Sequence, residues 1–218
     1  RYLLPSDEIV AERLAKAAHL PFERHFWTLE PSALQWDGEG VFLAQRTSLL
    51  DPARNPGMTE ALAEEKLESL LGAERVIWLD AILGGDAIFH RLGGAIRFLS
   101  PNHVLLMKAR SQEDPNFELF NALGRICEEA GFKVSLLPSP GRVEDRDGDI
   151  MAASYLHYVQ SRKRIILPLY GTDYDDDALN AMAAICPDHE IIGLRSDHLL
   201  SGGGSFHHIC LPQPQWPF

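Results

Sequence analysis

The sequence predicts an α/β protein, and two observations support this. Pairs of short apolar strands recur along the chain, and each pair is followed by an amphipathic helix and one further strand. This order runs about three times, which indicates structural repetition without sequence identity. Because helices alternate with paired strands, the residue pattern indicates an α/β or α+β fold rather than an all-β fold. Because no linker interrupts the pattern, one domain is expected over residues 1–218.

The first part of the chain is expected to hold a helix, a hairpin and a second helix. Ser6 can cap a helix whose apolar residues recur at helical spacing. The turn sequence 37–40, Asp-Gly-Glu-Gly, between two apolar runs is typical of a β-hairpin. Thr59 can cap a second helix that ends at Gly72. The predicted elements are helices over 6–18 and 59–72, strands over 26–29, 33–36, 41–45 and 75–79, and a loop over 51–56.

The remainder repeats this order. A Ser-Pro-Asn turn at 100–102 separates two apolar strands, and a helix with one apolar face ends before Gly131. Residues 138–149 are charged and rich in proline and glycine, so a mobile loop is expected there. The predicted strands are 95–99, 103–107, 133–137, 153–159, 164–169 and 190–194, the predicted helices are 116–130 and 175–186, and the histidines of the glycine-rich tail are expected on a strand.

Charge and cysteine content limit the partners. The formal net charge of -11 argues against nucleic acid and anionic membranes, and it would suit a cationic small molecule. No apolar run is long enough to span a bilayer, and no signal peptide is recognised. The three cysteines, Cys127, Cys186 and Cys210, lack framework spacing, so a reducing, cytoplasmic setting is expected. The chain begins with Arg1 rather than Met, so we expect the natural start to lie outside it.

Motifs that follow one another along nearly the whole chain resemble a single enzyme family. The tail 202–210, Gly-Gly-Gly-Ser-Phe-His-His-Ile-Cys, resembles Gly-Gly-Gly-Asn-Ile-His-Cys, and Gln213-Pro214 follows it at the expected distance. Further matches are Asp-Gly-Glu-Gly at 37–40, Leu-Leu-Asp-Pro-Ala-Arg-Asn-Pro at 49–56, Gly-Asp at 85–86, Ala-Ser-Tyr-Leu at 153–156 and Cys-Pro-Asp at 186–188. In this order, with these gaps, they resemble the agmatine deiminase family, a branch of the peptidyl-arginine deiminase superfamily.

The resemblance implies a pentein fold, an α/β propeller of five ββαβ units around a polar central site. Members of that family are longer than this chain, so the sequence corresponds to the C-terminal part of the family pattern. The region before Arg1 should then hold at least one more unit and an acidic residue that binds the guanidinium. The propeller is expected to be incomplete in this fragment unless a homo-oligomer or a partner chain supplies the rest.

The resemblance also implies a reaction. Family enzymes attack a guanidinium carbon with a cysteine thiolate, and a histidine serves as acid and base. Alignment without gaps puts His208 at the position of this cysteine, and Cys210 follows two residues later. On a strand these two side chains would share a face, about 7 Å apart, so Cys210 could be a displaced nucleophile. The alternative is that Cys210 is an inert buried thiol.

The second catalytic motif also departs from the family. The family run Gly-Asp-x-Thr-Asp-Gly-His-x-Asp aligns with residues 85–93, so Phe89 and Gly93 replace acids and Arg91 falls on the catalytic histidine. His90 is one residue out of register, and a bulge could restore it as the base. An ordinary, partly buried histidine is the alternative for His90.

Two carboxylates keep their family places. Asp86 and Glu30 are expected to bind a cationic guanidino small molecule, although each could equally be a solvated or capping carboxylate. The family's two glycines after this glutamate are here Pro31 and Ser32, which stiffen the loop. His207, His208, Cys210 and His90 are all of metal-ligand type, and a transition-metal site is the minor alternative. Adjacent histidines on a strand point opposite ways and no second Cys or His cluster has a recognised spacing, so no metal and no cofactor is predicted.

Two functions remain open from the sequence. The first is a pseudoenzyme that keeps the deiminase fold, lacks its chemistry and acts as a binding or structural subunit. The second is an active C–N hydrolase of guanidino compounds that uses Cys210, His90 and His208 in a rearranged site. The loss of the nucleophile, the histidine register and two acids together favours the first.

Overall fold

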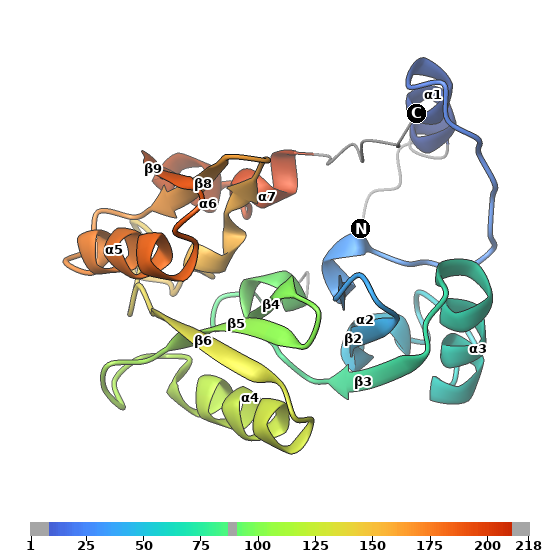
Figure 1. The fold of residues 1–218 in the computed structure, drawn as a ribbon, viewed down its shortest axis with the longest axis horizontal. Helices are drawn as coiled ribbons and strands as arrows, with labels where there is room; N and C mark the ends of the chain where they lie inside the picture. Colours follow the sequence, from blue (N-terminus) through green and yellow to red (C-terminus); the bar gives the residue numbers. More distant parts are fainter. Residues whose placement is uncertain (1–8, 87–90, 211–218) are drawn as a thin grey trace.

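The computed structural model describes residues 9–86 and 91–210, and it contains three small sheets of three strands each. Each sheet belongs to one unit, in which two strands are followed along the chain by a helix and a third strand (Figure 1). The first unit holds β1 (Leu34–Trp36), β2 (Val41–Gln45), α3 (Glu60–Leu71) and β3 (Arg75–Leu79). The second holds β4 (Ile96–Ser100), β5 (His103–Lys108), α4 (Phe117–Glu129) and β6 (Lys133–Pro138), and the third holds β7 (Val159–Gln160), β8 (Arg164–Leu169), α5 (Asp175–Ile185) and β9 (Glu190–Arg195).

The three units share one topology. In each, the first two strands form an antiparallel pair, and the second strand pairs in parallel with the third. The parallel pairing needs a crossover, which α3, α4 or α5 supplies. The predicted threefold repetition is therefore confirmed. The described residues form an open array of sheets without a closed ring, so the propeller itself stays a prediction.

The middle strand of each sheet explains the apolar runs in the sequence. In β5, the four residues from Val104 to Met107 are all buried, because the strand is covered on both faces. One apolar cluster extends from Leu43 in the first sheet through β5 to Leu167 in the third. The single domain over 1–218 is consistent with this continuity but stays a prediction.

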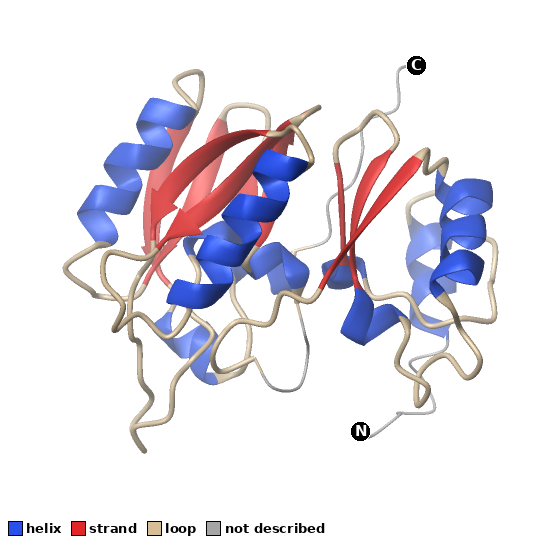
Figure 2. Ribbon diagram, turned by 90° about the horizontal axis from the view of Figure 1, so that it is seen from below, coloured by secondary structure: helices blue, strands red, loops and turns tan. Residues whose placement is uncertain are grey.

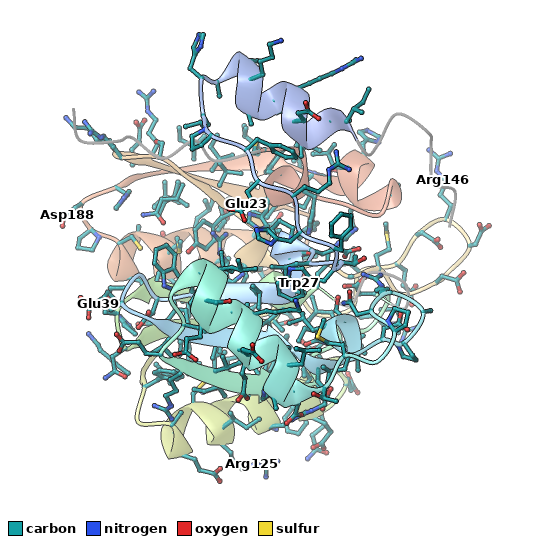
Figure 3. All side chains as sticks on the ribbon, turned by 90° about the vertical axis from the view of Figure 1, so that its right-hand side faces the viewer. Glu23, Trp27, Glu39, Arg125, Arg146 and Asp188 are labelled. Atoms are coloured by element: carbon teal, nitrogen blue, oxygen red, sulfur yellow. The ribbon has the colours of Figure 1, made fainter. Side chains whose placement is uncertain are left out.

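Each crossover helix covers its sheet from outside. Figure 2 shows the strands side by side with helices packed against them. Leu67 of α3 packs with Phe42 and Ala44 of β2 in a second apolar cluster. Trp27, labelled in Figure 3, lies beside α3, where Lys66 Nζ is 5.9 Å from the centre of its ring. The segment before β1 is thereby attached to the first unit.

The N-terminus of α3 forms as predicted. The Thr59 hydroxyl accepts a hydrogen bond from the backbone N–H of Leu62 at 3.2 Å, and the helix ends at Gly72. We expect Thr59→Ala to lower the free energy of unfolding by about 1 kcal/mol, because one helical N–H loses its acceptor. Chemical denaturation measures this.

Ser69→Ala in the same helix is the matched control. The Ser69 hydroxyl only donates back to the Lys66 carbonyl, so alanine there should be neutral or slightly stabilising. Equal destabilisation by the two variants would contradict the capping role of Thr59.

Two predicted strands are wrong. Residues 26–29 form no strand, and 153–159 form the short 3-10 helix η4 (Tyr155–His157) followed by β7. The turn forms because the Ser154 hydroxyl accepts from the Leu156 N–H at 3.0 Å and donates to the Gly94 carbonyl at 2.7 Å. Two further 3-10 helices, η2 (Pro31–Ala33) and η3 (Leu92–Gly94), and the short helix α2 (Arg46–Leu49) were not predicted.

The tail is helical rather than extended. It contains α6 (Asp197–Ser201) and α7 (Phe206–Ile209). Ser205 and His208 form a capping box at the start of α7, and the buried hydroxyls of Ser196 and Ser205 lie 3.1 Å apart. These polar contacts join the start of α7 to Ser196, the residue before α6.

The ends and the long loop complete the description. Helix α1 (Val10–Ala17) begins later than predicted and buries none of its residues, and Ser6 lies outside the described residues. In the loop 138–149 the Asp145 carboxylate accepts the N–H groups of Asp147 and Asp149. Arg146 projects at the tip of this loop (Figure 3). Among the described helices, none is long and apolar enough to cross a bilayer.

Candidate functional site

A cavity of about 210 Å³ lies where the second and third units meet the tail. Its walls come from the segment before η3, the end of the long loop, η4 and the glycine-rich turn between α6 and α7. The lining residues that matter for the site are Asp86, Arg91, Asp145, His157, Gly203 and Gly204. One of the two predicted substrate-binding acids, Asp86, lines this cavity.

His157 is the most unusual lining residue. Its side chain is buried, and neither ring nitrogen has a hydrogen-bond partner among the described residues. A β-carbon at Gly94 would lie only 2.5 Å from its Nε2, so the ring needs this glycine. Burial lowers the pKa of His157 well below its usual value, and His208, His207, Arg91 and Arg97 lower it further. The ring is therefore neutral at physiological pH.

The turn that holds His157 is fixed by Arg97. Its Nη1 donates to the carbonyls of Leu156 at 3.0 Å and Tyr158 at 2.7 Å, on either side of His157. Its guanidinium also lies 3.9 Å from the centre of the Tyr158 ring. Arg97 thus positions η4 without entering the cavity lining.

Two histidines of the tail, His207 and His208, lie close to His157. The ring centres of His157 and His208 are 4.7 Å apart, and those of His207 and His208 are 5.6 Å apart. Burial is the main cause that lowers the pKa of both His207 and His208 to about 4. Nδ1 of His208 accepts the Ser205 N–H at 3.0 Å, so in the neutral ring the proton is assigned to Nε2.

Arg91 forms hydrogen bonds with both Asp86 and the glycine-rich tail. Its backbone N–H donates to Asp86 Oδ2 at 2.9 Å, and its Nη1 donates to the Gly203 carbonyl at 2.6 Å. Burial lowers the pKa of this guanidinium, while attraction to Asp86 and Glu30 opposes the shift. The protein's own cation therefore interacts electrostatically with both predicted substrate-binding acids.

Glu30 has a second cation beside it. Arg54 Nη1 lies 2.7 Å from Glu30 Oε1, and Arg54 Nε lies 3.5 Å from Asp51. The side chains of Arg54 and Glu30 are only 15% and 24% exposed, so this pair is partly shielded from water. The loop that carries Arg54 is held next to the segment of Glu30, because the Asn55 side-chain amide donates hydrogen bonds to the carbonyls of Thr28 and Leu49.

The structure brings some predicted site residues together and separates others. Asp86 lines the cavity, Glu30 interacts with Arg91 electrostatically, and His208 packs against His157. Cys210 is exposed at the end of α7 and is not part of the cavity lining. The expectation that His208 and Cys210 share a strand face is wrong because the segment is helical. His90 lies outside the described residues.

Sequence reasoning missed His157. The signal was present, because His157 stands where the resembled motif Ala-Ser-Tyr-x-Asn has asparagine. An imidazole at that place is buried only because η4 turns inward, which the expected strand over 153–159 concealed.

Three further observations concern the described residues outside this site. No group of three His, Cys, Asp or Glu side chains among them could hold a metal ion. Cys127 is buried in α4, and burial raises the pKa of its thiol to about 11, as expected for a structural thiol. A larger cleft of about 450 Å³, between Arg110 and Tyr174, contains none of the predicted site residues.

Known proteins resemble this chain over nearly its whole length. The sequence pattern of the family described as Porphyromonas-type peptidyl-arginine deiminase matches residues 1–214. A provisionally named agmatine deiminase of Mycoplasma mycoides subsp. mycoides is 29% identical over 230 residues, which cover 95% of this chain and 63% of that protein. The agmatine deiminase structure of Enterococcus faecalis has a TM-score of 0.86 and 26% identity, covering 95% of this chain and 63% of its own.

A structure of agmatine deiminase from C. jejuni, with 23% identity and a TM-score of 0.83, supports the fold alone; it covers 92% of this chain and 60% of its own. The chain thus spans less than two thirds of the length of these relatives. The matched structures share its mixed α/β pentein architecture.

Proposed function

The chain belongs to the Porphyromonas-type peptidyl-arginine deiminase family, and from this premise we propose that it is a deiminase-like protein that does not hydrolyse guanidino compounds. The relatives support a scaffold of guanidino hydrolases. The observation that carries the proposal is Arg91, which lines the cavity, binds Asp86 through its backbone N–H and attracts Asp86 and Glu30 through its guanidinium charge. We expect the protein to serve as a binding or structural subunit.

The charges around the cavity argue against binding of a cationic substrate. A guanidinium needs carboxylates that lack a counterion, but the Arg91 guanidinium already attracts Asp86, and Arg54 pairs with Glu30. A second guanidinium would have to enter next to Arg91 in a partly desolvated site, where like charges repel strongly.

The tail argues against nucleophilic attack. His208 occupies the aligned position of the cysteine, and its Nδ1 accepts the Ser205 N–H. The remaining nitrogen carries the proton in the neutral ring, so it has no lone pair for attack. The exposed thiol of Cys210 lies outside the cavity lining, and attack requires close alignment.

The open array of three units supports one further part of the proposal. A homo-oligomer or a partner chain would complete the ring of ββαβ units, given the greater length of the relatives. Light scattering on the natural protein would measure its mass in solution. A strictly monomeric natural protein of this length would contradict that part.

The experiment is an ammonia-release assay on the natural protein with agmatine and with arginine. We expect no release above the buffer rate, while the Enterococcus faecalis agmatine deiminase serves as the positive control. Turnover that Cys210→Ala abolishes would overturn the proposal in favour of the displaced nucleophile. Cys186→Ala, at the end of α5, is the matched control for thiol removal.

A further inference from the structure

Resting on the proposed function, we propose that the cavity beside His157 binds a neutral amide or ureido group on a short alkyl chain, and that it selects against the guanidinium of the same shape. A guanidinium and a ureido group are planar and of similar size, but they differ by one positive charge. The selection therefore depends on the charges of the cavity rather than on its volume.

The two predicted acids interact with positive charges of the protein itself. The Asp86 carboxylate accepts the Arg91 backbone N–H and attracts the Arg91 guanidinium, and Glu30, which is outside the cavity lining, lies 2.7 Å from Arg54. Asp145 also lines the cavity, but it is exposed and its carboxylate accepts two loop N–H groups, so water screens its charge. A neutral ligand enters this balanced site without the cost of an added charge.

His157 offers unpartnered polar atoms at the cavity. A buried imidazole without a hydrogen-bond partner is costly, so a polar ligand in contact with it would recover that cost. The neutral ring offers one donor and one acceptor. An amide or ureido group offers the same two functions in return, whereas a guanidinium has no acceptor.

The size and the apolar walls of the cavity suit a short alkyl chain. The volume of about 210 Å³ exceeds that of several water molecules, at about 30 Å³ each in the liquid. Apolar side chains complete the lining and could accommodate a short alkyl chain; they are Ile150, Met151, Ala152 and Leu200. Apolar walls with a small number of polar groups are typical of small-molecule sites.

The test compares N-butylurea with N-butylguanidinium, which share an alkyl chain and differ in charge. Calorimetric titration and thermal shift on the natural protein are expected to show at least tenfold tighter binding of N-butylurea. Arg91→Gln should reduce this preference by about tenfold or reverse it. Arg142→Gln, which removes an exposed arginine paired with Glu144, is the matched control and should leave the preference unchanged.

His157→Asn provides a second variant should Arg91→Gln not fold, and it is expected to weaken N-butylurea binding at least fivefold. The ¹⁵N resonances of the His157 ring should shift when N-butylurea binds to the unsubstituted protein. Tighter binding of N-butylguanidinium, or no saturable binding of either compound, would overturn the inference. The proposed function fails separately, since only ammonia release from agmatine or arginine contradicts it.

Discussion

Gly85→Ala is expected to lower the free energy of unfolding by about 3 kcal/mol, with a fall in Tm of roughly 6–12 °C. Gly85 has a φ of +86°, and a β-carbon there would lie 2.3 Å from the backbone carbonyl oxygen of Ile150. The nearest atoms belong to the backbone of 150–152, so no side-chain rotation can relieve the clash. This backbone forms one wall of the cavity. The variant should therefore also weaken any ligand binding there.

Gly57→Ala separates the cost of the positive φ from the cost of the backbone clash. Gly57 also has a positive φ, +76°, but no heavy atom lies within 4 Å of a β-carbon built on it. Alanine there should lower the free energy of unfolding by only about 1–2 kcal/mol, the cost of a positive φ for a residue with a β-carbon. Urea denaturation of both variants measures the difference. Equal losses would show that the backbone of 150–152 adjusts freely.

Acidification from pH 7 to pH 5 is expected to lower the free energy of unfolding by roughly 2–4 kcal/mol. His157, His207 and His208 have pKa values below 6.5 when folded, mainly because of burial. In the unfolded chain they titrate near 6.5, so the unfolded state binds more protons below that pH. Stability is thus full above 6.5 and falls as pH decreases toward 4. Denaturant unfolding at several pH values measures the slope.

One substitution tests the origin of this slope. His157→Asn should remove about one third of the pH dependence, because one of three depressed histidines is lost. His198→Gln replaces an exposed histidine and should leave the slope unchanged. Identical slopes in these two variants, or equal stability of the unsubstituted protein at pH 7 and pH 5, would refute the proposed linkage.

The repeated part of the fold could be predicted from the sequence because its signals are local. Thr59, the helix end at Gly72 and the apolar run Val104–Met107 each determine an element through capping, backbone conformation or burial. The errors lie where side-chain hydrogen bonds replace strand pairing. Ser154 caps η4, and Ser205 caps α7, so both segments turn although their composition suits strands.

The sequence by itself determined the family and the replacements at His208, Arg91 and Gly93, because aligned motifs need no geometry. Only the tertiary structure decided what those replacements do. It put Arg91 beside Asp86, brought His157 against His208, and left Cys210 exposed. The physical reason is that burial of His157 against His208 and the bond from Arg91 to Gly203 join segments far apart in sequence, which no local pattern encodes.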